Sequence, residues 1–278
     1  MIVIARRLAG VLPYRAIYFP SEKDISKLTS ELRSTEMMRL FYTQHDLEAS
    51  PTLIRRETAL TVLNDLREPA DRISGKFERP TRQEIRQAEK LGVGDRVEII
   101  SNGPTALHDF LSVYNAFAAS KPGVWTLSRR AAERYAYNSD VRVLYLDGRP
   151  AVVNMVMRDP EAHRVRGIFS ASRRLEAADK RNARIFGHLN RLLHWRNMLL
   201  YQEQGFTTYD WGGVTRDAAD GIAKFKRSFG GQLVLENIYF CARARRLSTG
   251  LLMLYQNLSA RGRHLRRALR EQAATTNS

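Results

Sequence analysis

The sequence predicts a mixed α/β (α+β) fold, in which a mostly antiparallel sheet is flanked by helices and accompanied by a smaller N-terminal subdomain. Three observations carry this prediction. Two strand-like runs flank an Asp-Gly turn between residues 141 and 157. A long segment with apolar residues at helical spacing covers residues 183–204. A strand, a short basic helix and another strand then occupy residues 207–242.

The N-terminal third contains a predicted helix start at Thr81. Residues 1–75 alternate apolar and polar pieces without a recognisable motif, and we treat them as an N-terminal subdomain. Thr81-Arg-Gln-Glu84 has the pattern of a capping box and Gly92 that of a helix stop, which predicts a charged helix over Thr81–Leu91. A second helix is expected over Pro104–Ala119, where apolar side chains form a buried stripe.

The middle of the chain predicts three antiparallel strands followed by a helix. Val141–Leu146 and Ala151–Met157 flank Asp147-Gly148, a dipeptide typical of a tight hairpin turn. Arg164–Ser172 is expected to add the third strand. A basic loop over Arg173–Arg181 then leads into the long helix.

A glycine-rich segment follows that helix. In Tyr209-Asp-Trp-Gly-Gly-Val214, the strand-like residues end at two glycines, which let the backbone turn or approach a ligand closely. The segment Gly221–Gly231 carries apolar residues at helical spacing among three basic residues, and its two final glycines end the helix. Gln232–Ala242 is again strand-like.

These segments resemble Fem-type (FemAB/FemX-like) transferases of the GNAT acyltransferase superfamily. The Tyr-Asp-Trp-Gly-Gly run, the following GIAKFKRSFGG helix and the apolar strand are similar to the C-terminal part of that family. Phe77–Gly92 is similar to the basic helix that precedes its catalytic domain. The resemblance covers about residues 70–242 and implies the GNAT fold. It implies a GNAT-like domain over 76–246, after a subdomain over 1–75 that is a candidate degenerate GNAT-like half.

The charge indicates an anionic partner. The chain of 278 residues has a formal net charge of +16 and a pI of about 10.4. Nucleic acid, anionic lipid headgroups and phosphorylated small molecules all fit such a charge, and a solvated basic face is the alternative. Residues 247–278 are expected to form a basic amphipathic helix with a disordered tail. That helix could lie on an anionic membrane or dock its leucines on the domain.

Composition also bounds the compartment. The single cysteine, Cys241, excludes an intramolecular disulfide and favours a reducing compartment. Apolar runs stay shorter than the roughly 18–20 residues that span a bilayer. We therefore expect a cytoplasmic protein, with peripheral contact to the inner face of the membrane as an option.

The predicted donor site lies between the third strand and the long helix. In the GNAT arrangement this strand end and helix N-terminus receive the donor's phosphates, because unpaired N–H groups and the helix dipole favour negative charge. The usual acetyl-CoA signature is absent, so acyl-CoA and aminoacyl-tRNA both stay open as co-substrates, and the short N-terminal region favours acyl-CoA. No tightly bound cofactor is expected, and an ordinary charged loop is the alternative. The candidate donor-binding residues are Ser170, Ser172, Arg173, Arg174, Lys180, Arg181 and Asn182.

The implied chemistry is attack of an amine on an activated acyl carbon, which needs a deprotonated amine, a stabilised oxyanion and a protonated leaving group. Asp210 is the candidate to hold or deprotonate the acceptor ammonium, with turn capping at Gly212 or Gly213 as the alternative. Lys226 matches the lysine of the family's F-K-x-x-F-G pattern, which implies a role in binding donor phosphate or steadying negative charge. Tyr209 and Tyr239 are candidates to protonate the leaving group, or else core residues.

Other enzyme classes have little support. The six histidines lie far apart without metal-ligand spacing, so no metal site is predicted, and no Walker loop, dinucleotide fingerprint or nucleophile elbow is present. The resemblance to Fem-type transferases therefore implies an acyltransferase that uses an amine of a cell-envelope polysaccharide or peptidoglycan-type precursor as acceptor. The alternative is a non-catalytic module that binds nucleic acid or an anionic surface on the same fold.

Overall fold

The computed structural model describes residues 1–8, 12–33, 36–43, 45, 47, 52–92, 97–101, 103–121, 124–177, 179–217 and 220–243. Contacts divide the chain into two compact units. The first comprises Met1–Thr58 with Asn237–Ser278, and the second comprises Ala59–Glu236. The divisions fall within two long strands, β4 and β10, which pass from one unit into the other. The boundary expected from the sequence was near residue 75.

The first unit is a small sheet with one helix. Strands β1 and β2 form an antiparallel hairpin, β2 pairs with β3 in parallel, and β3 pairs with the last residues of β10 in antiparallel fashion. Helix α1 begins at a capping box, in which the Ser21 side chain and Asp24 bond to each other's backbone. The elements are β1 (Ile2–Leu8), β2 (Leu12–Tyr18), α1 (Glu22–Ser30), β3 (Met37–Thr43), β4 (Leu53–Asp65) and β10 (Gln232–Ala242).

The second unit holds the remaining strands and helices. Its strands follow the order β4-β9-β8-β7-β6-β5, in which only the β8 and β9 pair is parallel. Its elements between β4 and β10 are α2 (Ala70–Gly75), α3 (Arg79–Glu89), β5 (Val97–Ser101), α4 (Pro104–Ser120), α5 (Arg129–Ala136), β6 (Ser139–Leu146), β7 (Arg149–Asp159), β8 (Arg164–Ser172), the 3-10 turn η1 (Arg173–Glu176), α6 (Lys180–Glu203), β9 (Thr208–Val214) and α7 (Gly221–Arg227).

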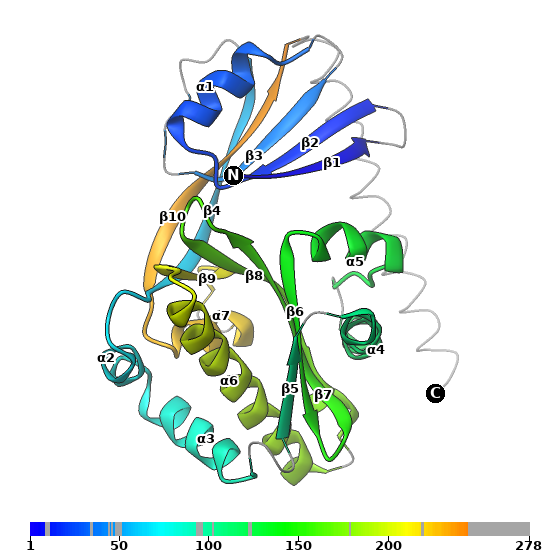
Figure 1. Ribbon diagram of the computed structural model, residues 1–278, viewed down its shortest axis with the longest axis vertical. Coiled ribbons are helices and arrows are strands. Elements are labelled where there is room, and N and C mark those ends of the chain that lie inside the picture. Colours follow the sequence, from blue (N-terminus) through cyan, green and yellow to red (C-terminus); the bar gives the residue numbers. More distant parts are fainter. Residues whose placement is uncertain are drawn as a thin grey trace. The chain divides into compact units, whose positions relative to one another are not determined.

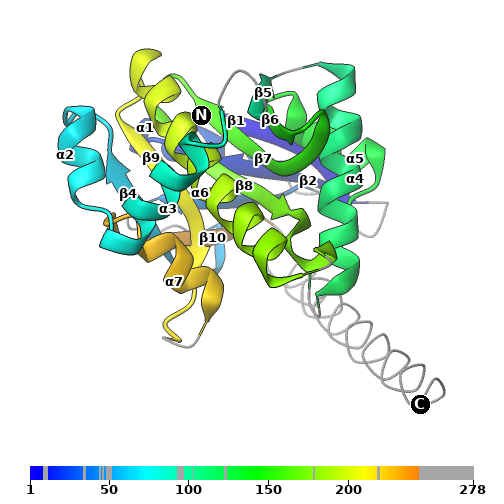
Figure 2. The same ribbon diagram turned by 90° about the horizontal axis from the view of Figure 1, so that it is seen from below.

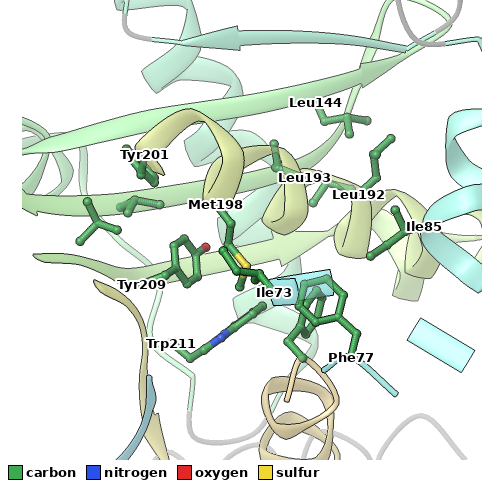
Figure 3. Packing of buried hydrophobic residues seen from close by; sticks show 14 of the residues in the cluster. Ile73, Phe77, Ile85, Leu144, Leu192, Leu193, Met198, Tyr201, Tyr209 and Trp211 are labelled. Atoms are coloured by element: carbon green, nitrogen blue, oxygen red, sulfur yellow. The ribbon is translucent and has the colours of Figure 1, made fainter. Parts of the chain in front are cut away.

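Helices cover both faces of this sheet. Helices α4 and α5 pack on one face, and α6 with α3 packs on the other, so the unit has three layers (Figures 1 and 2). On the α6 side, Leu192 and Leu193 meet the sheet, while Phe77 and Trp211 fill the space towards α7 (Figure 3). On the α4 side, Phe110 packs against residues of β6, β7 and β8 in a separate cluster. The sheet is therefore apolar on both faces.

An irregularity in β8 positions the candidate site. The register between β7 and β8 shifts after Met155. Met155 pairs with Phe169 but the next residue, Val156, pairs with Gly167, so Ile168 of β8 is left without a pairing partner on β7. The parallel pairing of β8 with β9 is limited to Arg164–Arg166 and Thr208–Asp210. Both strands continue beyond these residues, so their hydrogen-bond ladder opens after Arg166 and Asp210, although the Gly167 carbonyl still lies close to Gly212.

Most predicted elements of this unit are confirmed. The hairpin turns at Asp147 and Gly148, both with positive φ, as the Asp-Gly pair predicted. Strand β8 has the predicted bounds, and so does β10. The long helix begins at Lys180, three residues before the predicted start, and so takes in the end of the predicted basic loop.

The predicted capping box at Thr81 is wrong. Helix α3 begins at Arg79, its N-cap residue Glu78 makes no side-chain capping bond, and Thr81 lies inside the helix. The Thr81 side chain is buried, and its hydroxyl donates to Ser228 Oγ at 2.9 Å. A tertiary contact thus uses the threonine that the pattern assigned to a local cap. The predicted helix and tail over residues 247–278 lie outside the described residues.

Candidate functional site

A basic pocket lies along the first turns of α6. Its volume is about 410 Å³, and it is lined by Glu84, Arg174, Lys180, Ala183, Arg184, Gly187, His188 and Arg191. Four of these side chains are cationic and one is acidic. One face of α6 supplies most of the wall, because Lys180, Arg184, His188 and Arg191 are spaced three or four residues apart.

The pocket residues are held by contacts with neighbouring elements. Arg191 pairs with Glu84 of α3, with 2.9 Å between Nη1 and Oε2, and its guanidinium lies 4.9 Å from the centre of the Phe225 ring. Arg174 lies close to the helix at Gly187, where an added Cβ would be in ordinary van der Waals contact, 3.9 Å from Arg174 Nη1. Burial lowers the pKa of His188, so this side chain adds little positive charge near neutral pH.

The structure places the four basic donor-binding candidates in three different surroundings. Arg174 and Lys180 line the pocket. Arg173 is engaged elsewhere, because it donates to the Pro150 carbonyl at 2.7 Å and to Glu176 Oε2 at 2.7 Å. Exposed Arg181 lies on the first turn of α6, outside the pocket lining.

The other three polar candidates lie around the same turn. Asn182 is tied to the helix cap, since its backbone N–H donates to Asp179 Oδ1 at 2.7 Å and its amide donates to Asp179 Oδ2 at 3.0 Å. Ser172 directly precedes the 3-10 turn η1. Ser170 lies 3.5 Å from His194 Nε2 on α6.

Lys226 lies where β8 and β9 stop pairing. Its Nζ donates to the Gly213 carbonyl at 2.7 Å. An added Cβ on Gly212 would be 3.7 Å from Lys226 Nζ and 3.9 Å from Arg166 Nε, so the ammonium lies beside the opening and near a second cation. Burial, together with the charge of Arg166, lowers the pKa of Lys226 to about 8.

Asp210 is fully buried in a network of charged side chains. Its Oδ2 accepts from Arg164 Nε at 3.2 Å and from Arg166, and its Oδ1 accepts from the Thr61 hydroxyl and from the Gly212 N–H at 2.8 Å. Burial alone raises the pKa of Asp210, but the two arginine charges outweigh it and hold the pKa below its ordinary value. This geometry supports the turn-capping alternative and does not support the role of a base for an acceptor ammonium.

The network extends to Glu236 at the end of the second unit. Arg164 Nη2 lies 2.7 Å from Glu236 Oε1, and Arg166 Nη1 lies 3.6 Å from Oε2. Glu236 has no exposed surface, and burial raises its pKa. Arg164, Arg166 and Lys226 thus face two carboxylates, which leaves an excess of positive charge beside the opening.

The two predicted tyrosines are both core residues with bonded hydroxyls. The Tyr209 hydroxyl is 2.9 Å from His194 Nδ1, and the ring is fully buried. Tyr239 belongs to the first unit, where its hydroxyl donates to the His45 carbonyl at 2.8 Å and accepts from the Leu47 N–H at 3.3 Å. The surroundings of both tyrosines are therefore those of core residues, the alternative given for them in place of protonating the leaving group.

Two further properties concern the described part of the chain as a whole. Across those residues, no three His, Cys, Asp or Glu side chains come together in a way that could hold a metal ion. Each helix within the same ranges is too short or too polar to cross a lipid bilayer.

Sequence reasoning missed several site residues. Arg184, His188 and Arg191 form a basic stripe at helical spacing. The stripe can be read from the sequence, but the helix was assigned from its apolar residues and this second stripe was not considered. Arg164 and Arg166 alternate along a strand, a pattern that normally places both on a solvated face. Their burial depends on two carboxylates far away in the sequence, so no local signal identified it.

Comparisons with known proteins agree with this architecture. No protein-family model matches the sequence, and no curated protein matches it. Among solved structures, the chain is similar to FemX at 12% identity, with 89% of this chain and 85% of that chain covered and a TM-score of 0.63. It is also similar to a C-terminal domain assigned to a lysylphosphatidylglycerol synthetase from Agrobacterium fabrum, at 14% identity, 91% and 83% coverage and a TM-score of 0.58. The L-PGS structure from Bacillus licheniformis matches at 13% identity, 87% and 82% coverage and a TM-score of 0.53. The chain therefore has a Fem/GNAT-like fold, as predicted.

Proposed function

We propose that this protein is an acyltransferase that moves an acyl or aminoacyl group from a phosphate-bearing donor to an amine. The observation that carries the proposal is the basic pocket on α6, whose Arg191 contacts Phe225 of the helix that also presents Lys226. The basic pocket and the half-buried Lys226 ammonium are thus connected through one aromatic side chain. This arrangement suits a donor with an anionic end and a reactive acyl end.

A coenzyme A thioester is the donor that the pocket favours. A volume of about 410 Å³ is within the range typical of small-molecule sites, and its cationic side chains suit a diphosphate. Aminoacyl-tRNA is the second candidate, because the net charge of +16 provides basic surface for more phosphates. The resemblance to Fem-type transferases supports an amine of a cell-envelope polysaccharide or peptidoglycan-type precursor as acceptor.

Lys226 is the residue that we place at the reacting centre. When the amine attacks the acyl carbon, negative charge develops on the carbonyl oxygen, and a fixed cation in a poorly solvated site stabilises it. With a pKa lowered to about 8, Lys226 is still mostly protonated at pH 7. Asp210 serves this site indirectly in the proposal, because it fixes Arg166 beside Lys226.

Donor binding is tested with two pocket variants and one matched control. Arg174→Ala and Arg184→Ala should each weaken binding of coenzyme A by about tenfold or more, because each removes a charge-assisted contact to phosphate. Arg181→Ala removes an equal charge from the same helix outside the pocket lining and should change affinity by less than about twofold. Calorimetry gives the affinities, and thermal unfolding checks that each variant is folded. Equal affinity in all three variants would refute the donor site.

The alternative function is a non-catalytic module that binds nucleic acid or an anionic surface. The excess of positive charge favours it, and salt dependence separates the two readings. Binding of tRNA should fall by orders of magnitude between about 50 and 200 mM salt if six or more phosphates are contacted. A protein that binds tRNA in this way, ignores coenzyme A and transfers no acyl group from acyl-CoA or aminoacyl-tRNA to an amine would contradict our proposal.

A further inference from the structure

A row of polar side chains crosses the sheet face beneath α6. Arg142, Asn154 and Ser170 are direct neighbours on β6, β7 and β8, so their side chains point to the same face. Leu144 and Val152 share that face and belong to its hydrophobic cluster. Asn154 is 1% exposed, and within the described part of the chain neither of its amide atoms has a hydrogen-bond partner. Since burying such groups is costly, a polar row in an apolar layer indicates a functional role.

The exposed end of this row is connected to a buried chain of side chains. Ser170 is exposed, and its hydroxyl lies 3.5 Å from Nε2 of His194, which is only 5% exposed. The other ring nitrogen, Nδ1, lies 2.9 Å from the Tyr209 hydroxyl. Ser170, His194 and Tyr209 thus come from three different elements, β8, α6 and β9.

The surroundings of His194 keep its ring neutral. Burial, followed by the charges of Lys226 on α7 and Arg191 on α6, lowers the pKa of His194 to about 3. The aromatic rings of Trp211, Phe225 and Phe229 also pack around the imidazole and offer it no compensating charge. A ring that resists protonation is a poor base for activating a serine nucleophile.

One of the two directions in which this hydrogen-bond chain can run leaves the Ser170 hydroxyl free to donate outwards. Burial raises the pKa of Tyr209, so this hydroxyl keeps its proton and can donate it in a hydrogen bond to Nδ1. A neutral imidazole that accepts at Nδ1 carries its hydrogen on Nε2, and it therefore donates to Ser170 Oγ. The Ser170 O–H is left pointing away from the ring, towards the exposed side.

We propose that Ser170 is a catalytic residue whose hydroxyl, fixed by His194 and Tyr209, donates a hydrogen bond to the carbonyl oxygen of the acyl donor. This inference rests on the proposed function. The hydroxyl keeps its proton throughout and forms no bond to the acyl group. The amine nitrogen forms a bond to the acyl carbon, the bond from that carbon to the donor's leaving group breaks, and the proton lost by the amine ends on the leaving group. Ser170 would act from β8 while Lys226 acts from α7, and together they would stabilise the oxyanion. His194 and Tyr209 are positioning residues in this scheme.

The hydrogen arrangement is tested without turnover. NMR of protein labelled with ¹⁵N in its histidine rings, with His194 assigned through a His194→Gln variant, should show a neutral ring with hydrogen on Nε2 from pH 5 to 8. Tyr209→Phe removes the donor to Nδ1 and should weaken that tautomer preference. A ring that is protonated at pH 6, or that carries its hydrogen on Nδ1, would overturn the inference.

The catalytic role is tested with acetyl-CoA and an amine acceptor that supports turnover. Ser170→Ala should lower kcat by about 10²–10³-fold with little change in the KM for the donor, because the lost contact forms only as charge develops. Ser170→Thr keeps a hydroxyl and should restore most of the rate. Ser26→Ala removes an exposed hydroxyl from helix α1 of the first unit and serves as the control.

The outcomes distinguish this inference from the function on which it rests. An active wild-type protein in which Ser170→Ala keeps its kcat would overturn the role of Ser170 alone. A wild-type protein that transfers no acyl group from acyl-CoA or aminoacyl-tRNA would overturn the proposed function and the role of Ser170 with it.

Discussion

Replacing Gly212 by alanine should disturb the opening between β8 and β9 directly. Gly212 has a φ of +73°, a left-handed conformation that residues with a Cβ rarely adopt. An added Cβ would also lie 2.6 Å from the Gly167 carbonyl oxygen, a backbone atom of β8 that cannot rotate away. The substitution therefore strains the backbone and pushes the two strands apart at the same place.

The expected cost follows from these two effects. A left-handed residue with a Cβ costs roughly 1–2 kcal/mol, and overpacking against fixed atoms costs roughly 1–3 kcal/mol. Together they predict that Gly212→Ala lowers the free energy of unfolding by about 2–5 kcal/mol. The neighbouring Gly213 has no atom within 4 Å of an added Cβ and no positive φ. Gly213→Ala should therefore leave stability unchanged or raise it by up to about 1 kcal/mol, since the unfolded chain loses freedom.

Equilibrium unfolding in guanidinium chloride measures this difference. Trp211 is 3% exposed and directly precedes the two glycines, so its fluorescence reports the unfolding of this part of the protein. Coenzyme A affinity, measured at a denaturant concentration where both variants are folded, shows whether the strain also reaches the donor pocket. If the two variants differ by less than about 0.5 kcal/mol, the close approach of β8 and β9 at Gly212 is not as described.

Two further predictions concern charged side chains. Asp210→Asn should lower the free energy of unfolding by about 3–5 kcal/mol, because Arg164 and Arg166 lose a buried charged partner. Chemical denaturation measures this difference, and a variant as stable as the wild type would contradict the network. With a pKa lowered to about 8, Lys226 is charged below that pH and loses its proton above it, so kcat should fall as pH rises through about 8. Lys226→Met should lower kcat at pH 7 and abolish that limb of the profile, whereas a rate that rises above pH 8 would indicate a base instead.

Local sequence patterns predicted those elements of the second unit whose formation depends on neighbouring residues in the chain. The Asp147-Gly148 turn needs positive φ at both positions, which this dipeptide supplies more easily than most. The capping box at Thr81 failed because a tertiary partner, Ser228, competes for the same hydroxyl. A pattern of a few residues contains no information about a partner on another helix.

The candidate site was predictable in its location and less so in its members. The strand end and helix start near residue 180 were expected to bind phosphate, and the pocket lies there with Arg174 and Lys180 in its wall. Arg181 has the same charge but a different direction, which depends on the register of the helix. The role of Asp210 could not be foreseen, because the parallel pairing of β8 with β9 brings it to Arg166.

The passage of β4 and β10 between the units has a consequence for synthesis of the protein. The second unit is one continuous segment, Ala59–Glu236, whereas the sheet of the first unit needs Asn237–Ala242 to pair with β3. At about 5–20 residues per second, the ribosome needs roughly 10–35 s to make the intervening segment. During that time the edge of β3 has no strand to pair with and is open to pairing with other chains. The middle of the nascent chain can therefore finish folding before its beginning, since the sheet of the first unit is completed only when β10 emerges.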